Sequence, residues 1–328
     1  MDIDFCLSAK IKRKNPEHYF CPLTAGVLEG TVVKSTGKYS LVKLIDGKVV
    51  TTSLKGKMRL QKSRETHVVA VGDKVTLEKR NDDWIIEDIL PRRNQLNRKA
   101  TKLSRSVHVV AANIDQILII ASAKNPKTPL GFIDRVTATA ESYSIPSILI
   151  INKIDLLDSD EDVEKWTNIG RLYQDIGFEV IPASIYDTES MEKVLEILRG
   201  RETLVTGQSG VGKSSIINAI DPVLNIKTSV VSNFNEKGKH TTTFAEMHKL
   251  SFGGHVIDTP GVRSFGLIEI DRRFLSHYFP EMEALLGQCK YYDCTHLDEP
   301  GCKVKEMVDR GEIAESRYMS YLSMYYEG

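Results

Sequence analysis

Alternation of apolar and polar residues is the strongest pattern in residues 25–90. The run GVLEGTVVKSTGKYSLVKLIDGKVVTTSL repeats with a period of two, and turn pairs interrupt it at Thr36–Gly37 and Asp46–Gly47. The segments VAVGDKVTLEK and DWIIEDIL continue this pattern. About five strands, with no convincing helix between the early ones, predict a small β-barrel such as an OB-fold, an architecture that often binds RNA.

The hydrophobic period changes beyond a basic connector at residues 91–105. Apolar runs at 116–123, 147–155 and 178–184 indicate buried strands, and helical segments lie between them. The same alternation continues through TLVTGQSG, the residues from Lys213, and HVIDTPG. It predicts a mostly parallel sheet with helices on both faces, whose ligands bind at the carboxyl ends of the strands.

A third pattern begins after Gly266, with a Cys/His cluster and the helical tail KVKEMVDRGEIAESRYMSYLSMYYE. We therefore predict a multidomain chain: an N-terminal β-barrel (OB-fold), a central α/β P-loop domain and a C-terminal, mostly α, metal-binding module. The expected boundaries are 1–92, 93–267 and 268–328. A length of 328 residues agrees with two or three domains.

The composition is that of a soluble globular protein. Apolar residues make up 41% of the chain and charged residues 27%, which argues against a disordered or fibrous class. No run approaches the roughly 20 apolar residues of a membrane-spanning helix, and the start MDIDFCLSAKIKRKN lacks an apolar signal centre. We expect a cytoplasmic protein with no membrane partner, and a monomer, because no dimer signature is evident.

Charge is distributed unevenly along a chain whose net charge is zero. Residues 1–110 hold 22 Lys and Arg but only 12 Asp and Glu, and the rest of the chain carries the opposite balance. Clustered basic residues gain binding free energy by releasing phosphate counterions. The split favours a polyanion such as RNA as the partner of the N-terminal part, and a solvated surface is the alternative.

A phosphate-binding loop pattern occupies residues 207–214. The segment matches G-x-x-x-x-G-K-S/T, follows the apolar run LVT and precedes the helix-forming run SSIINAI. Backbone N–H groups at the glycines surround phosphate oxygens, Lys213 reaches the β and γ phosphates as a catalytic candidate, and the Ser214 hydroxyl ligates Mg²⁺. A chance match is the alternative, and the strand before and the helix after the loop argue against it. The candidate nucleotide ligands are Gly207, Gln208, Ser209, Gly210, Val211, Gly212, Lys213 and Ser214.

A base-recognition pattern ends the apolar run SILII. Asn152, Lys153, Ile154 and Asp155 form an N-K-x-D tetrad that resembles the guanine-specificity motif of GTPases, in which the Asp accepts from the ring N1–H and the exocyclic amine. A short Asn/Asp turn after a strand is the alternative, and the phosphate loop makes that alternative weaker. Ala183–Ser184 resembles the accessory S-A loop, with the two residues in reversed order.

A magnesium and γ-phosphate pattern follows the apolar residues HVI. Asp258 and Gly261 belong to a D-x-x-G motif, in which the Asp holds Mg²⁺ through water and the Gly N–H senses the γ-phosphate. A simple Pro-Gly turn is the alternative. The polar segment 235–244 between the two phosphate motifs suits a mobile switch that supplies a Thr hydroxyl to Mg²⁺, from Thr241, Thr242 or Thr243.

The order of these motifs indicates a circular permutation. In most GTPases the phosphate loop comes first and N-K-x-D comes late, whereas here the tetrad at 152 precedes the loop at 207 and D-T-P-G at 258. The permutation tethers the residues beyond 266 to a nucleotide-sensing loop. That arrangement suits a switch that moves an attached domain.

One position near the reaction centre departs from the common pattern. Val262 follows D-T-P-G where many GTPases place a water-orienting Gln, and a valine cannot position water. Intrinsic hydrolysis should therefore be slow. His240 is a candidate for orienting water near neutral pH, and a solvated loop histidine is the alternative.

Three cysteines and a histidine crowd into the C-terminal module. Cys289, Cys294, His296 and Cys302 supply the ligands of a closed tetrahedral zinc site, which leaves no open position for water and is therefore structural. Unrelated thiols are the alternative. Such a spacing suits a metal better than disulfides in a reducing compartment.

The permuted motif order together with this cluster resembles the ribosome small-subunit-dependent GTPase A family (RsgA), over nearly the whole chain. The resemblance implies an OB-fold, a GTPase that binds the small (30S) ribosomal subunit and its 16S rRNA late in assembly, and hydrolysis stimulated by that subunit. It implies GTP/GDP, Mg²⁺ and one structural Zn²⁺ as ligands. It also adds Ser215 to the phosphate ligands, favours Thr241 and Thr242 among the threonines and identifies His240 with the family's proposed catalytic histidine.

Two functions of other classes compete with this one. The first is a nucleic-acid-binding module whose nucleotide site is inactive, and the intact Lys213, Ser214 and Asp258 argue against it. The second is a permuted GTPase that acts on a protein or a membrane. The basic N-terminal part and the missing apolar span argue against the second.

Overall fold

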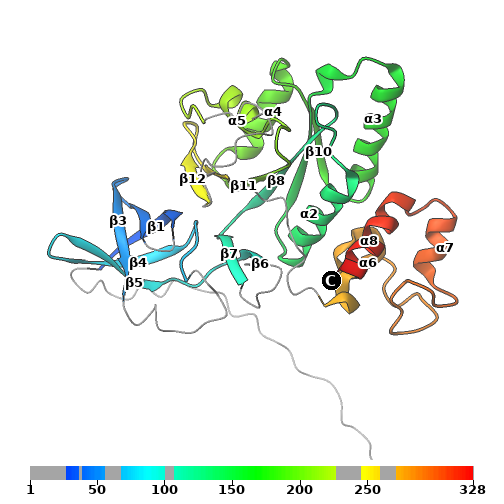
Figure 1. Ribbon diagram of the computed structural model, residues 1–328, viewed down its shortest axis with the longest axis horizontal. Helices are drawn as coiled ribbons and strands as arrows, with labels where there is room; N and C mark the ends of the chain where they lie inside the picture. The colour runs from blue at the N-terminus through cyan, green and yellow to red at the C-terminus, as the bar shows by residue number, and fades with distance from the viewer. Residues whose placement is uncertain are drawn as a thin grey trace, which may run out of the picture.

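The computed structural model describes residues 27–36, 39–55, 68–99, 107–226, 245–258 and 271–327. Figure 1 shows a small barrel at one end, a central sheet flanked by helices, and a helical C-terminal module at the other end. The predicted multidomain architecture is confirmed. Within the described ranges, no helix has the length and apolar character needed to cross a bilayer.

The N-terminal unit is a closed barrel of five strands. Each strand pairs with the next in the order β1-β2-β3-β5-β4, and the pairing of β1 with β4 closes the ring. Apolar side chains on alternate positions fill the interior, among them Val32, Val42 and Leu77, as the period of two requires. The strands are β1 (Val27–Ser35), β2 (Ser40–Leu44), β3 (Val49–Leu54), β4 (Lys74–Arg80) and β5 (Asp83–Ile89).

Part of the basic connector is a strand. β6 (Gln95–Lys99) pairs with β7 (Val107–Ala112) in an antiparallel hairpin. The hairpin lies against the barrel at Gly72, where an added Cβ would stand 2.0 Å from the Ala112 carbonyl oxygen. The close approach and the positive φ of 89° make glycine the residue suited to that position.

The central unit is a six-stranded sheet in the order β10-β9-β8-β11-β13-β12, parallel except for β12. β8 and β9 are buried along their whole length, which explains their uninterrupted apolar sequences. The strands are β8 (Gln116–Ser122), β9 (Ser147–Asn152), β10 (Glu179–Ala183), β11 (Glu202–Thr206), β12 (Glu246–Lys249) and β13 (His255–Asp258). The helices are α2 (Leu130–Ser142), η1 (Ile154–Leu156), α3 (Asp160–Asp175), α4 (Thr188–Leu198) and α5 (Lys213–Ile220).

The two faces of this sheet carry separate cores. Ile117 and Ile119 of β8 belong to the core that includes residues of α2 and α3. Leu118 and Ile120 belong to the core that includes residues of α4 and α5. Alternate residues of one strand thus bury against helices on opposite faces, which confirms the predicted layers.

The C-terminal module is helical around its metal-ligand cluster. Its helices are η2 (Arg272–Tyr278), α6 (Pro280–Glu283), α7 (Lys303–Asp309) and α8 (Glu315–Glu327). The predicted helical tail is therefore two helices, which separate at Gly311 with a φ of 73°. A core that includes Phe279, Val304 and Tyr321 holds the module together.

A buried ionic network joins this module to the central unit. Arg317 of α8 donates to Asp134 of α2 at 2.7 Å and to Glu281 of α6 at 2.7 and 3.1 Å. Asp134 also accepts from Tyr173 at 2.6 Å and from Ser320. Because these groups satisfy one another, a charge can remain buried at the junction.

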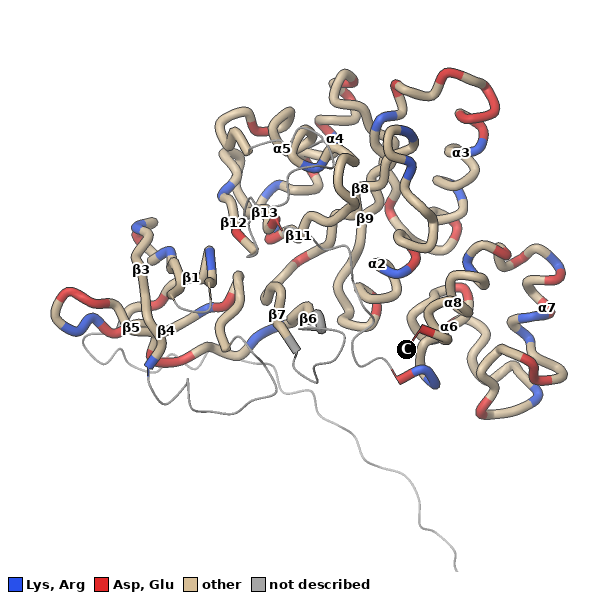
Figure 2. Tube along the Cα trace, viewed as in Figure 1, with Lys and Arg blue, Asp and Glu red and all other residues tan. Residues whose placement is uncertain are grey.

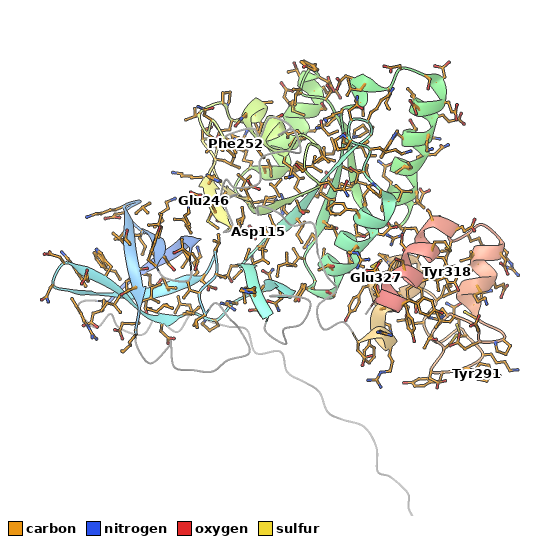
Figure 3. The ribbon with its side chains drawn as sticks, in the orientation of Figure 1. Asp115, Glu246, Phe252, Tyr291, Tyr318 and Glu327 are labelled. Carbon is orange, nitrogen blue, oxygen red and sulfur yellow. The ribbon has the colours of Figure 1, made fainter. Side chains whose placement is uncertain are left out.

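The barrel meets the sheet along the edge of β12. Lys34 of β1 pairs with Glu246 of β12 in the ladder, and their side chains form an ion pair at 2.8 Å. Figure 3 shows Glu246 on the side of the central unit that faces the barrel. Basic and acidic residues are mixed on the barrel (Figure 2), where residues 27–99 of the described ranges hold 11 Lys and Arg and 8 Asp and Glu. Most of the excess positive charge therefore lies outside the described residues.

Candidate functional site

The phosphate loop connects β11 to α5 at the carboxyl edge of the central sheet. Gly207 and Gly212 have φ angles of 152° and 98°. A Cβ at Gly207 would stand 2.3 Å from the Ile120 carbonyl oxygen, and one at Gly212 would stand 2.4 Å from the Asn152 Nδ2. The two glycines are thus required by backbone conformation and by close neighbours.

Lys213 begins α5 and folds back over the loop. Its Nζ donates to the carbonyl oxygens of Gly207 at 2.8 Å and Gln208 at 2.9 Å. Burial lowers the pKa of Lys213, and the charge of Asp258 acts in the opposite direction. The ammonium is therefore held at the loop, facing the charge of the D-x-x-G aspartate.

The N-K-x-D tetrad lies against the phosphate loop. Asn152 is buried at the end of β9, and its Nδ2 donates to the Val211 carbonyl at 2.8 Å. Lys153 adopts the left-handed conformation, and its Nζ donates to the Gly210 carbonyl at 2.7 Å and to the carbonyl of Asn125. Two motifs more than 50 residues apart in sequence thus form one surface.

Two observations fit a ligand at this surface. The Asn152 Oδ1 is buried and has no hydrogen-bond partner among the described residues. Such an orphaned acceptor is costly unless a further donor completes it. Asp155 lies in η1, the short helix that begins directly after Lys153 at the same edge of the sheet.

Some of the remaining residues predicted to bind phosphate or magnesium lie within the described ranges, and others lie outside them. Ser214 and Ser215 lie half-buried in the first turn of α5, and Asp258 ends β13, in register with Val205 of β11. The structure therefore brings Asp258 beside the strand that leads into the phosphate loop. Outside the described residues lie His240, Thr241, Thr242, Thr243, Gly261 and Val262.

The side chains of the accessory pair Ala183–Ser184 are buried at the end of β10. Ala183 is the last residue of β10, and Ser184 follows it with its side chain packed into the turn. Ser184 Oγ accepts from the Tyr186 N–H at 3.2 Å, and its carbonyl accepts from the Asp187 N–H at 3.0 Å. This pair shapes the loop that follows β10.

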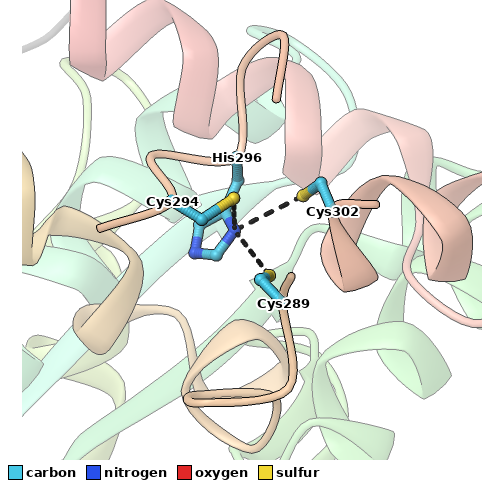
Figure 4. Close-up of side chains that lie close together, drawn as sticks. All are labelled: Cys289, Cys294, His296 and Cys302. Atoms are coloured by element: carbon cyan, nitrogen blue, oxygen red, sulfur yellow. Dashed lines mark hydrogen bonds between the residues drawn. The ribbon is translucent and has the colours of Figure 1, made fainter. Parts of the chain in front are cut away.

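Four candidate metal ligands converge in the C-terminal module (Figure 4). The Nδ1 of His296 lies 3.6 Å from the sulfurs of Cys289 and Cys294 and 3.5 Å from that of Cys302. All four ligand atoms lie within 4.8 Å of one another. Tetrahedral zinc with bonds of about 2.3 Å to sulfur and about 2.0 Å to nitrogen requires separations of this size.

Burial holds two of these thiols in the neutral form unless a cation binds among them. Burial raises the pKa of Cys294 to about 12 and also raises that of Cys302. Neutral thiols are poor ligands, so a bound cation must stabilise the thiolates. The donor set therefore fits a metal with soft, tetrahedral preferences.

Hydrogen bonds that the sequence did not predict stabilise the loop that carries this cluster. Glu299 accepts from the N–H groups of Thr295 at 2.7 Å and Leu297 at 2.9 Å. Burial alone would raise the pKa of Glu299, but the hydrogen bond from the Thr295 hydroxyl, followed by those from the backbone N–H groups, lowers it to about 2. Tyr318 donates to the His296 carbonyl and Tyr321 to the Thr295 carbonyl, both at 2.7 Å. The E-P-G segment before the last cysteine was the available sequence signal.

Comparisons with known proteins agree with this geometry. The family model for RsgA GTPase matches residues 89–268. The Small ribosomal subunit biogenesis GTPase RsgA of Christiangramia forsetii is 42% identical over 301 residues, which cover 90% of this chain and 95% of the relative. The protein of the same name from Bacteroides fragilis is 41% identical over 298 residues, with 90% and 96% covered.

Solved structures show the same likeness. The crystal structure of YjeQ from Thermotoga maritima aligns with a TM-score of 0.69 and 34% identity, over 92% of this chain and 98% of that one. The structure of YloQ, described as a circularly permuted GTPase, aligns with a TM-score of 0.70 and 27% identity, over 95% and 97%.

Proposed function

The chain belongs to the RsgA GTPase family, and we propose that it hydrolyses GTP on the small ribosomal subunit during late maturation of that subunit. The observation that carries the proposal is the contact of the N-K-x-D tetrad with the phosphate loop, through Asn152 and Lys153. Relatives named for small-subunit biogenesis match over 90% of the chain, which supports the same partner here.

In this proposal different site residues bind the phosphates, the Mg²⁺ and the base of the nucleotide. Backbone N–H groups from Gly207 to Ser215 hold the phosphates, and Lys213 neutralises charge that develops on the β and γ groups. Ser214 ligates Mg²⁺ directly, and Asp258 does so through water. Asp155 accepts from the guanine N1–H and exocyclic amine, a donor pair that adenine lacks.

Hydrolysis requires a water in line with the bond between the γ phosphorus and its bridging oxygen. We assign the orientation of that water to His240, because the side chain of Val262 has no polar atom for the task. Thr241 or Thr242 completes the Mg²⁺ shell. The nucleotide leaves as GDP and the γ group as phosphate, and the small subunit accelerates the step.

The C-terminal cluster holds one structural Zn²⁺ in this proposal. Three thiolates and an imidazole fill the tetrahedral shell, so no position remains for a catalytic water. The ion fixes the module that follows the nucleotide-sensing D-x-x-G loop in sequence. Nucleotide state and the position of this module are therefore coupled through a short tether.

The N-terminal unit is proposed to bind 16S rRNA. Support comes from the barrel and from the excess of Lys and Arg in residues 1–110, most of it outside the described residues. The protein would act as a monomer in the cytoplasm, where small subunits mature.

The test is GTP hydrolysis by the purified chain with excess small subunits, large subunits or neither, beside an ATP control. Stimulation by small subunits alone is expected. A rate indifferent to ribosomal particles would overturn the proposed partner and leave a GTPase with another activator. Equal turnover of ATP would overturn the role of Asp155.

A further inference from the structure

A cavity of about 430 Å³ lies at the seam between the barrel and the central sheet. The neighbouring strands β1 and β12 mark this seam (Figure 1). Both units supply walls: Lys43 and Lys74 come from the barrel, and Glu202 and His255 come from the central sheet. Cavities of this size commonly hold small ligands. A molecule bound here would contact both units at once.

Two lysines flank a threonine on the outer face of the barrel. Thr31 of β1 pairs with Lys43 of β2 on one side and with Lys74 of β4 on the other. Residues that oppose one another in neighbouring strands point to the same face, so the three side chains form one row. Neighbouring strands lie about 4.8 Å apart, so the two lysines begin about 10 Å apart and their long side chains can reach one bound group. All three residues line the cavity.

Neither lysine has a carboxylate partner within the ranges that the structure describes. The Lys43 Nζ lies 3.4 Å from the His255 Nε2, and the Lys74 Nζ donates to the Thr31 Oγ1 at 2.8 Å. The Thr31 hydroxyl keeps its own hydrogen for a further acceptor. Two ammonium groups and a hydroxyl in one row are the donors that bind an anionic oxygen group such as phosphate.

The central sheet holds one of these lysines in place. The His255 Nδ1 lies 3.0 Å from the Glu202 Oε1. Because a carboxylate only accepts, the Nδ1–H donates to Glu202, and the Nε2 is left to accept from Lys43. Two of the three ammonium hydrogens of Lys43 then remain for a ligand. A donor that is already positioned loses less entropy when the ligand binds.

The rest of the lining suits an organic group better than a second phosphate. Leu90 and Met247 add apolar surface to the cavity, and Glu29 adds a carboxylate. Glu29 lies two positions before Thr31 on β1, so both side chains lie on the same face. A second phosphate would be repelled by this carboxylate, whereas a hydroxyl or amino group would donate to it.

We propose that the cavity binds a small phosphomonoester, either a sugar phosphate or a mononucleotide. Its phosphate accepts from Lys43, Lys74 and Thr31. Its organic part lies against Leu90 and Met247, and one of its hydroxyl groups donates to Glu29.

The position of this cavity makes it a second site, independent of the proposed function. Glu202 and His255 are the first residues of the parallel strands β11 and β13 and pair with each other in the ladder. The phosphate loop and Asp258 lie at the opposite ends of the same strands. A ligand in the cavity should therefore bind whether or not the nucleotide site is occupied.

The test is titration calorimetry at low salt on the chain saturated with GDP and Mg²⁺, so that the nucleotide site is already filled. The probes are inorganic phosphate, ribose 5-phosphate and AMP. Ribose 5-phosphate should bind roughly tenfold more tightly than phosphate, because it also fills the apolar part and reaches Glu29. A further gain with AMP would identify a mononucleotide as the ligand, and no further gain a sugar phosphate. Equal affinity for all three probes would overturn the contacts of the organic part.

Paired substitutions locate the binding of ribose 5-phosphate. Lys43→Met with Lys74→Met should lose roughly tenfold or more, and Lys43→Arg with Lys74→Arg, which keeps both charges, should stay within about threefold of the wild type. Lys79→Met with Lys165→Met is the matched control, because it removes the same charge from two exposed lysines outside the cavity. Equal losses in the cavity pair and in the control pair would overturn the site.

Amide shifts give a measurement that does not depend on the folding of a variant. Ribose 5-phosphate added to the GDP-saturated wild type should move the NMR signals of Thr31 and His255 and leave that of Lys153 in place. Unmoved signals at Thr31 and His255 would overturn the proposal.

An RNA strand is the other source of phosphate groups, and it is tested with a single-stranded oligonucleotide. If this RNA loses affinity in Lys43→Met with Lys74→Met while none of the three small probes binds the wild type, the lysines belong to an RNA surface. That result would overturn the small-molecule site.

Discussion

A single glycine shows how closely the two nucleotide motifs are packed. Gly212 has a φ of 98°, and its missing Cβ leaves room for Asn152. Gly177 has nearly the same φ, 97°, but a Cβ there would meet nothing within 4 Å. The two positions have the same backbone conformation, but only at Gly212 would an added Cβ collide with a neighbouring side chain.

Gly212→Ala should therefore abolish tight nucleotide binding, whereas Gly177→Ala should not. Both variants pay the same left-handed strain, on the order of 1 kcal/mol, but only the first pushes Asn152 away from Val211. We expect at least a tenfold loss of GDP affinity for Gly212→Ala and less than about twofold for Gly177→Ala, measured by fluorescence titration with a labelled GDP. Equal losses in the two variants would show that strain, not the collision, is responsible.

At the scale of helices, α2 carries both a favourable and an unfavourable charge contact with the C-terminal module. Arg317 and Asp134 are 1% and 0% exposed and satisfy each other. Burial alone would lower the pKa of Arg317, but the charges of Asp134 and Glu281 raise it above its ordinary value. The guanidinium thus stays charged inside the junction.

Arg317→Met should destabilise the chain strongly. The substitution leaves the Asp134 carboxylate buried with only the hydroxyls of Tyr173 and Ser320 as partners. Breaking one side of a buried pair costs about 3–5 kcal/mol. Urea unfolding should show this loss. The double variant Asp134→Leu with Arg317→Met should recover part of it, and no recovery would assign the loss to Glu281, which also loses Arg317, or to the Arg317 contact with the Phe279 ring.

Glu141 of α2 makes the unfavourable contact. Burial raises its pKa, and the charge of Glu283 raises it further. Because the folded pKa lies above the unfolded one, ionised Glu141 destabilises the fold at a pH above the folded value, and the penalty vanishes below the ordinary carboxyl pKa. Glu141→Gln should raise the melting temperature at pH 7 and leave it unchanged near pH 3.5. A gain that persists at the lower pH would contradict this electrostatic origin.

The sequence predicted contiguous features well and long-range contacts poorly. Apolar periods located the barrel, the buried β8 and β9 and the helical tail, because each is written within one segment. The sequence did not indicate the strand β6, which lies in the basic connector and has no clear apolar alternation of its own. It forms a strand because it pairs with β7. Arg317 and Asp134 lie 183 positions apart, so no local pattern could join them.

The site divides in the same way. The phosphate loop, the tetrad and the Cys/His cluster are short motifs whose chemistry requires fixed spacing, so their residues could be named in advance. Ala183 and Ser184 are buried in a turn whose hydrogen bonds the sequence does not encode, so their part in base binding stays a prediction. The contacts of Glu299, Tyr318 and Tyr321 with the cluster loop could be identified only from the folded structure.

At the scale of the whole molecule, the metal cluster should determine whether the C-terminal module is ordered. Removing the ion with a chelator leaves three thiols, of which Cys302 is buried, and the buried His296 without a cation, so the module core around Tyr321 should loosen. We expect one Zn²⁺ per chain by elemental analysis, and a lowered melting temperature that Zn²⁺ restores and Mg²⁺ does not. GDP affinity should change little, since no cluster residue belongs to the nucleotide site.

The barrel and the central sheet meet through a narrow seam. Lys34 and Glu246 supply the ladder pair and an ion pair whose side chains are 27% and 37% exposed. Lys43 of the barrel also approaches His255 of β13, at 3.4 Å. A partly exposed pair contributes at most about 1 kcal/mol. Val33 and Val71 also pack with the core of the central unit, so the ion pair is one of several contacts at the seam.

Glu246→Lys should weaken the seam, because it places two ammonium groups at the ladder pair. Small-angle scattering should report a larger radius of gyration for Glu246→Lys and for Lys34→Glu. The double exchange restores opposite charges and should return the radius to the wild-type value at low salt. Equal scattering from all four proteins would mean that backbone pairing alone seats the barrel.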